Sequence, residues 1–209
     1  MRGRVFFKGQ APAPKSIRMN QDAVCAAVGG ESVYSEEIVL NPDSTLANVF
    51  VYVKAGLGQK RYPVPATAVI LDQHNCRYVP HVVGLQVGQT LKILNSDLTF
   101  HNVHAAAKIN KPFNLGMSKV EKVKTRTFDQ AEVMIPLQCN VHPWMSAYVG
   151  VLEHPFFEVT DSTGSFELEA MPAGEYVVAA WHEVFGSMVQ EVKLAENETK
   201  TLDFIFTRR

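Results

Sequence analysis

Seven residues near the middle of the chain, Cys139-Asn140-Val141-His142-Pro143-Trp144-Met145, most constrain what it can fold into. Cys139, His142 and Met145 offer a thiolate, an imidazole and a thioether at intervals of three residues. Pro143 prevents the segment from continuing as a helix. Soft sulfur ligands beside an imidazole suit copper, and one ligand set that copper uses is two histidines, a cysteine and a weakly bound methionine. The second histidine has to come from elsewhere in the chain.

His101, in the stretch Phe100-His101-Asn102-Val103-His104, is the best candidate for that ligand. The alternating residues 132–138 predict a strand that runs out to Cys139, and residues 90–94 predict a strand that ends shortly before His101. In an extended segment His101 and His104 point to opposite faces, so only one of them can join the site. The sequence therefore predicts a metal site made by His101, Cys139, His142 and Met145.

These residues resemble the cupredoxins, the small blue copper proteins, and most of all the amicyanin type with its short Cys-x2-His-x2-Met loop. The resemblance covers roughly residues 62–153. It implies that His101, Cys139 and His142 are equatorial copper ligands and that Met145 is the axial one. It also implies that Asn102 ties the two ligand loops together by hydrogen bonds.

The resemblance implies a function as well: one copper ion that cycles between Cu(I) and Cu(II) and carries single electrons. The expected partners are redox proteins such as a c-type cytochrome or an oxidase, and no enzymatic activity is expected. The ring edge of His142 is the expected electron exit, through an apolar patch. A copper carrier is the main alternative, and it would need an open, exchangeable site. Zinc would accept Cys and His, although its sites do not use Met. A copper oxidase would need a second copper centre, and nothing around Cys139 supports a thiol hydrolase.

Cys25 and Cys76 remain as an even pair if Cys139 binds the metal. A disulfide between them would imply an oxidising compartment, and the alternative is two unrelated buried thiols. Because a cupredoxin normally works outside the cytoplasm, we favour the bridge and a periplasmic or other extracytoplasmic location. The opening Met1-Arg2-Gly3-Arg4 leads directly into strand-like sequence, so we expect no signal peptide in this chain.

Composition narrows the class of protein. The 209 residues are 46% hydrophobic and 20% charged, which is ordinary for a globular chain. No apolar run approaches the ~20 residues that a membrane-spanning helix needs. A net charge of −1 argues against a nucleic-acid partner. Residues 1–152 carry a net +6 and residues 153–209 a net −7, which indicates a boundary near Glu153.

We therefore predict an all-β protein in three parts. Residues 1–63 are expected to add strands to the copper domain, residues 64–153 to form a Greek-key cupredoxin sandwich, and residues 154–209 to form a smaller β-sandwich. The last part resembles the carboxypeptidase-regulatory or transthyretin-like domains, mainly at turn and core positions, and this implies a fold but no activity. Its Asp161-Ser162-Thr163-Gly164 turn predicts a hairpin.

Residues 105–127 read as one long connection between the ligand strands. Such a run of positive charge is usually just a solvated face, and docking of a partner is the second interpretation. The charged residues of this connection are Lys108, Lys111, Lys119, Lys122, Lys124 and Arg126. Met117 is an alternative axial ligand, disfavoured by its loop-like setting. His81 is interpreted as a core residue. The sequence leaves open whether His81, His104, His154 or His182 belongs to a second metal site.

Overall fold

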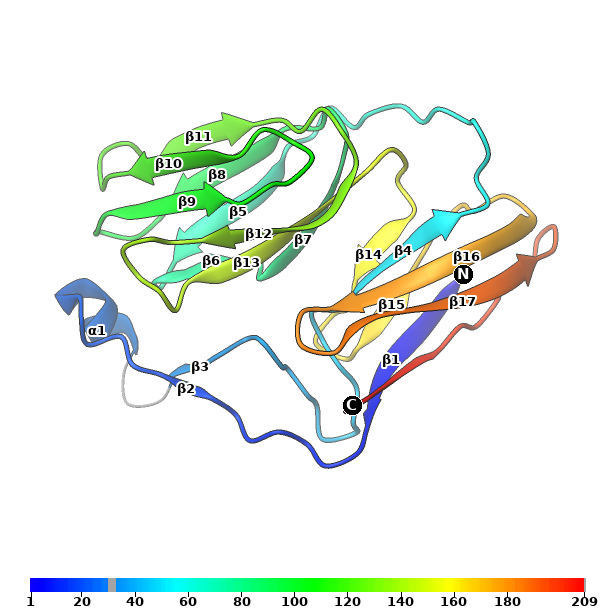
Figure 1. Ribbon diagram of the computed structural model, residues 1–209, viewed down its shortest axis with the longest axis horizontal. Helices are drawn as coiled ribbons and strands as arrows, with labels where there is room; N and C mark the ends of the chain where they lie inside the picture. Colours follow the sequence, from blue (N-terminus) through cyan, green and yellow to red (C-terminus); the bar gives the residue numbers. More distant parts are fainter. Residues whose placement is uncertain (30–32, 209) are drawn as a thin grey trace. The chain divides into compact units, whose positions relative to one another are not determined.

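The computed structural model describes residues 1–29 and 33–208, and nearly all of its regular structure is β-strand. The strands form two compact units, each made from segments that lie apart in the sequence (Figure 1). Unit 1 contains residues 1–13, 36–61 and 156–209, and unit 2 contains residues 14–35 and 62–155. The predicted all-β class is confirmed.

Unit 2 is a sandwich of two sheets with strand orders β10-β9-β12-β13-β7 and β11-β8-β5-β6. One buried cluster joins Val103 and Leu137 of the first sheet to Leu71 and Ile93 of the second, so the core lies between the sheets. The strands are β5 (Val69–His74), β6 (Arg77–Val79), β7 (Val82–Gln86), β8 (Leu91–Asn95), β9 (His101–Ala105), β10 (Phe113–Met117), β11 (Val123–Arg126), β12 (Glu132–Gln138) and β13 (Ser146–Leu152).

The rest of unit 2 is a short segment that contains β2 (Ser16–Ile17), α1 (Ala23–Gly29) and β3 (Val33–Tyr34). Asp22 caps the helix, because its Oδ1 accepts hydrogen bonds from the N–H groups of Val24 at 2.7 Å and Cys25 at 3.1 Å. Seven helical residues are too few to show a helical period, so the sequence predicted no helix here.

Unit 1 has a three-stranded sheet, β15-β1-β18, and a four-stranded sheet, β14-β4-β16-β17. Aromatic side chains fill the space between the two sheets; the ring of His182 in β16, for example, lies 6.0 Å from that of Phe206 in β18. The strands are β1 (Arg2–Lys8), β4 (Phe50–Ala55), β14 (Phe157–Val159), β15 (Ser165–Glu167), β16 (Gly174–His182), β17 (Gly186–Leu194) and β18 (Phe204–Thr207).

The expectation that residues 1–63 add strands to the metal-binding domain is wrong for most of that segment. β1 pairs with β15 and β18, and β4 pairs with β14 and β16, so both strands complete the sheets of unit 1. Only residues 14–35 and 62–63 of that segment belong to unit 2. Alternation along a strand identifies the strand but not its pairing partner. The resemblance of residues 154–209 to carboxypeptidase-regulatory domains stays a prediction.

Two smaller expectations also fail. The Asp161–Gly164 turn joins β14 to β15, which lie in different sheets, so it makes a crossing between sheets and not a hairpin. The stretch 105–127 contains β10 and β11, where a single long connection was expected. In both places the strands are only three to five residues long, which leaves little alternation to detect.

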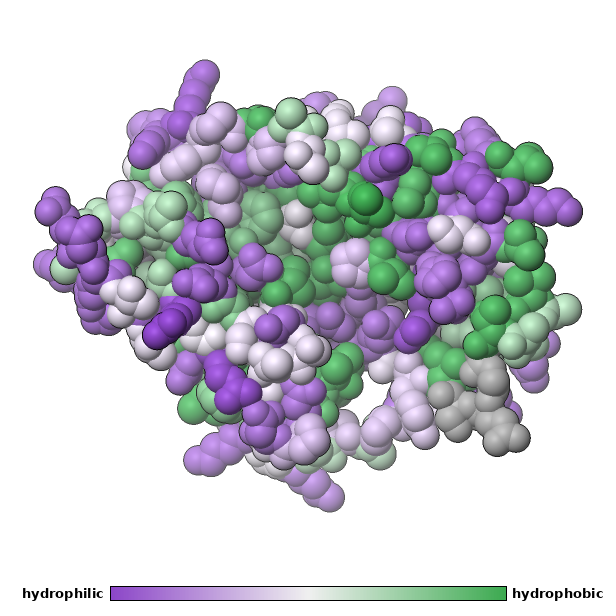
Figure 2. Space-filling model, turned by 180° about the vertical axis from the view of Figure 1, so that it is seen from behind, coloured by the Kyte–Doolittle hydropathy of each residue, from purple (hydrophilic) through white to green (hydrophobic). Residues whose placement is uncertain are grey.

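The revised boundaries also change the charge distribution. Unit 2 carries a net +2 and unit 1 a net −3, a much weaker contrast than a cut at Glu153 gives. On the face shown in Figure 2, hydrophobic side chains lie in separate groups among hydrophilic ones. Within the described ranges, no helix has the length and apolar character needed to cross a membrane.

Candidate metal centre

His101, Cys139 and His142 meet at one end of unit 2. His101 is the first residue of β9, and Cys139 and His142 lie in the loop between β12 and β13. Their ligand atoms all lie within 4.8 Å of one another. The two histidine Nδ1 atoms are 2.9 Å apart, and Cys139 Sγ is 3.8 Å from Nδ1 of His142. All three residues are buried, with exposed fractions of 0%, 3% and 1%.

Asn102 links the two strands that carry these residues. Its Oδ1 accepts a hydrogen bond from the backbone N–H of Asn140 at 2.8 Å and lies 3.4 Å from Cys139 Sγ. Its Nδ2 donates to Oδ1 of Asn140 at 2.9 Å and to Oδ1 of Asn114 at 2.7 Å. The predicted role of Asn102 in tying the loops together is confirmed. The Tyr78 hydroxyl also donates to the backbone carbonyl of Asn102, which fixes the residue from a third side.

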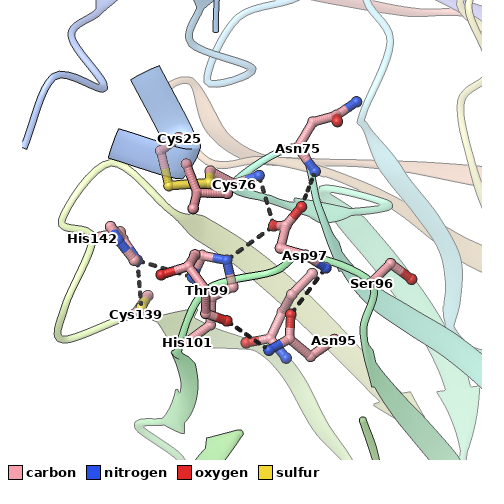
Figure 3. Close-up of polar contacts among 12 residues, drawn as sticks. Cys25, Asn75, Cys76, Asn95, Ser96, Asp97, Thr99, His101, Cys139 and His142 are labelled. Carbon is pink, nitrogen blue, oxygen red and sulfur yellow. Dashed lines mark hydrogen bonds and ion pairs between the residues drawn. A yellow bond between two sulfur atoms is a disulfide. The ribbon is translucent and has the colours of Figure 1, made fainter. Parts of the chain in front are cut away.

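Asp97 orients His101 from the side opposite the cysteine. Its Oδ2 lies 2.9 Å from His101 Nε2, and the carboxylate also accepts the backbone N–H groups of Asn75 and Cys76, both at 2.8 Å (Figure 3). Burial alone would lower the pKa of His101, but the hydrogen bonds to Asp97 and Cys139 raise it to about 9. The sequence analysis missed Asp97. Its position four residues before His101 is the only signal, and an Asp in a turn is common without such a role.

The environment of Cys139 favours the thiolate. Burial alone would raise the pKa of the thiol, but the contact with His101 and the backbone N–H groups of Asn102, His142 and Val141 lower it to about 6. Because the thiolate is the form that binds a metal, Cys139 is prepared for coordination at neutral pH. Burial, together with the interaction between Tyr78 and Cys139, raises the pKa of Tyr78 above its usual range.

A short segment covers the imidazole edge of His142. This cap segment, which we define as residues 14–29 and 33–35, is joined to the β5–β6 turn by the predicted Cys25–Cys76 disulfide, which is confirmed (Figure 3). Asp22 Oδ2 lies 3.4 Å from His142 Nε2 and accepts a 2.8 Å hydrogen bond from the Thr99 hydroxyl. The expectation of an exposed His142 ring edge is therefore wrong. Sequence analysis could not foresee this contact, because 120 residues separate its partners.

The two methionines near the site have different surroundings. Met145 closes the ligand loop: its N–H donates to the His142 carbonyl at 2.9 Å, and its carbonyl accepts from the Cys139 N–H at 3.2 Å. Its side chain is buried in the same cluster as Cys139. Met117 lies in β10 and not in a loop, and its Sδ accepts a hydrogen bond from Gln73 Nε2 at 3.2 Å. This engagement of Met117 favours Met145 as the thioether that is free to approach a metal.

The other histidines do not extend the site. Among the described residues, the groups of three or more potential ligands contain only two histidines, His101 and His142. Two further groups, Asp22-Cys25-His142 and Cys76-Asp97-His101, each include a sulfur that is already in the disulfide. His81 is buried, as expected, with Nδ1 3.0 Å from the Ser146 carbonyl oxygen. His182 stacks on Phe185 at 4.6 Å.

The donor set fits copper. One thiolate and two imidazole nitrogens converge in a buried space, and a thioether lies in the same loop. Imidazole and soft sulfur ligands suit copper, whereas magnesium and calcium prefer sets made of oxygen atoms.

Comparisons with known proteins give partial structural matches to copper proteins. No family model matches the chain, and no curated protein is significantly similar to it. A copper-containing nitrite reductase from Thermus scotoductus SA-01 is 19% identical over 46% of this chain, with a TM-score of 0.39. The match spans 26% of that enzyme's length. Two Cu(I) amicyanin variants are 22% and 23% identical over 48% of this chain and 97% of their own, with TM-scores of 0.37.

Proposed function

We propose that unit 2 is a mononuclear blue-copper module that carries single electrons between redox proteins. The observation that carries the proposal is the convergence of His101, Cys139 and His142, with ligand atoms within 4.8 Å of one another and almost no exposure to solvent. Met145 is proposed as the weak axial ligand. Bound copper would supply the one-electron change between Cu(I) and Cu(II).

The chain's own residues provide a fixed geometry for both oxidation states. Asn102 holds the loop of Cys139, and Asp97 holds the ring of His101, so neither ligand is free to move when the charge of the site changes. A site that does not rearrange keeps the cost of electron transfer low. A copper carrier, the alternative function, would need ligands that are accessible for exchange. The burial of all three side chains favours the electron-transfer role.

The proposed partners are redox proteins such as a c-type cytochrome or an oxidase. The proposed location is extracytoplasmic. The Cys25–Cys76 disulfide supports that location, because disulfides persist in oxidising compartments. Lys119 and Lys122 lie in the turn after β10, at the end of unit 2 that carries His101, because Met117 pairs with His101. Positive charge at this end would favour a partner with an acidic face.

The decisive experiment is to load the purified protein with Cu(II) and record its visible spectrum. An intense band from the thiolate is expected for the wild type and should be absent from Cys139→Ser, which should keep its folded circular dichroism signal. A colourless wild type that still binds one Cu(II) and releases it readily to a chelator would support the carrier. A protein that binds no copper would refute the metal site.

A further inference from the structure

Asp22 occupies an unusual position, because one carboxylate serves a helix cap and a buried imidazole together. Oδ1 accepts the N–H groups of Val24 and Cys25, while Oδ2 faces Thr99 and His142. The proposed copper site does not require such a residue, since three ligands and the thioether already complete the donor set. The position of Asp22 therefore needs a separate explanation.

The hydrogen-bond geometry determines which nitrogen of His142 carries a proton. The Nδ1 atoms of His101 and His142 are 2.9 Å apart, so one must donate to the other. Each Nε2 faces a carboxylate oxygen, Asp97 for His101 and Asp22 for His142, and a carboxylate can only accept. Both rings are thus protonated at Nε2, and a single proton lies between the two Nδ1 atoms. For His142, the contact with Asp22 places a proton on Nε2 and leaves Nδ1 directed at His101 and Cys139.

The cap segment is held in place by contacts that do not involve this carboxylate. The disulfide joins Cys25 to Cys76, whose carbonyl accepts a hydrogen bond from Trp144 Nε1 at 3.0 Å. Met19 and the two disulfide cysteines form a small apolar cluster against which Trp144 packs. Because the segment is fixed by these contacts, the approach of Asp22 to His142 is built into the fold and is not a chance position of a mobile side chain.

We propose that Asp22 is a positioning residue for His142. Its carboxylate accepts a hydrogen bond from Nε2–H of His142. This contact selects the tautomer whose Nδ1 lone pair faces Cys139 and His101, and it fixes the plane of the ring. A carboxylate on the outer nitrogen of a metal-binding imidazole also makes that imidazole a stronger donor. A stronger donor and a nearby negative charge stabilise Cu(II) more than Cu(I). Asp22 therefore lowers the reduction potential of the copper site. This part of the inference rests on the proposed function.

Two substitutions separate this role from the helix cap. Asp22→Ser keeps a side chain that caps helices well but is too short to reach His142. Asp22→Asn keeps the shape and the cap but removes the negative charge. Asp203→Asn is a matched control, because Asp203 is an exposed aspartate of unit 1 whose Oδ1 accepts the Arg4 N–H.

The first measurement uses metal-free protein, so that it is independent of copper binding. Nitrogen-15 NMR of the histidine rings should show His142 protonated at Nε2 in the wild type and the Asp203→Asn control. Asp22→Ser should show a mixture of the two tautomers. A wild-type His142 ring without a proton on Nε2, or a spectrum identical in Asp22→Ser, would overturn the inference even if the protein binds copper.

The second measurement is the reduction potential of the copper-loaded protein. Asp22→Asn should raise it by an amount equal to at least a threefold change in the ratio of Cu(II) to Cu(I) affinity, and a tenfold change is about 59 mV for one electron. Unchanged potentials in both Asp22 variants would refute the tuning role. If the wild type binds no copper, the proposed function fails, and the NMR result alone decides whether Asp22 positions His142.

Discussion

Asn102 and Asn140 are joined by two hydrogen bonds in opposite directions, from the Asn140 N–H to Asn102 Oδ1 at 2.8 Å and from Asn102 Nδ2 to Asn140 Oδ1 at 2.9 Å. Asn140 follows Cys139, so this pair fixes the cysteine relative to β9. We predict that Asn102→Ala lowers the free energy of unfolding by about 1–3 kcal/mol, because it removes several hydrogen bonds made by one buried side chain. Urea denaturation of the metal-free protein measures this. Asn114→Ala, which removes one of the same contacts, should cost less, and equal losses would contradict the specific role of the Asn102–Asn140 pair.

His101→Ala should abolish the copper chromophore, whereas His104→Ala should retain it. His101 faces Asp97 and His142, while His104 is three residues along the same strand and points to the other face of the sheet. Copper stoichiometry and the visible spectrum of both variants test this. Equal damage from the two substitutions would mean that the assigned face of β9 is wrong.

Replacing Met145 with Leu should keep the copper and raise its reduction potential. Leu conserves volume in the buried site, while the loss of a weak sulfur donor disfavours Cu(II). The matched control is Met117→Leu, whose thioether is held by Gln73, and its potential should stay at the wild-type value. A shift in the Met117 variant alone would assign the axial position to Met117.

Glu132 stabilises unit 2 when it is ionised, so unit 2 should lose stability when this carboxylate is protonated in acid. Burial alone would raise its pKa, but hydrogen bonds from the backbone N–H groups of Asn110 and Lys108 and from the Asn110 side chain hold it below 4.5. The contribution of Glu132 to the free energy of unfolding is fully present above the pKa that it has in the unfolded chain. This contribution disappears as the pH falls through the lower pKa that it has in the folded protein. We expect Glu132→Gln to lose about 1–3 kcal/mol at pH 7 and less below pH ~4.

The exposed Glu153→Gln is the control for this prediction, and it should follow the wild type at every pH. Metal-free protein is used for all three, because copper binding would add its own pH dependence. A gap between wild type and Glu132→Gln that stays constant from pH 7 to pH 3 would show that ionisation of Glu132 is not what stabilises the fold.

Reversing the charges at the metal end should slow electron transfer to an acidic partner. The double substitution Lys119→Glu/Lys122→Glu reverses two charges in the turn after Met117, the last residue of β10, which pairs with His101. Lys108→Glu/Lys111→Glu makes the same change in charge before β10 begins, at the opposite end of the strand. Stopped-flow rates with a c-type cytochrome that presents an acidic face, across a salt series, should fall with salt in wild type and control. The first variant should be slower with a flatter slope; equal slopes in all three would refute steering.

The convergence of His101, Cys139 and His142 could be predicted from the sequence because most of its information is local. Cys139, His142 and Met145 lie within one loop, and the strand before Cys139 and the extended segment at His101 supply the direction of approach. The disulfide followed from the remaining cysteines together with the family resemblance. Asn102 could be assigned for the same reason, since it is adjacent to a ligand.

The parts that could not be predicted depend on contacts between distant residues. Asp22 reaches His142 because the disulfide and the packing around Trp144 place α1 there, and an Asp before a short helix otherwise indicates nothing more than a cap. Residues 1–63 were expected to add strands, but nothing in the sequence of β1 or β4 distinguishes pairing with β18 or β16 from pairing within the metal-binding unit. The expected exposure of His142 failed for the same reason, because its cover comes from a separate segment.

The parallel pairing of β1 with β18 sets an order of assembly during synthesis. β1 begins at Arg2 and β18 ends at Thr207, so the three-stranded sheet of unit 1 cannot be completed until synthesis has reached Thr207. Every residue of unit 2, by contrast, has been synthesised by Pro155. The proposed histidine and cysteine ligands, together with both halves of the disulfide, can therefore come together before β1 pairs with β18.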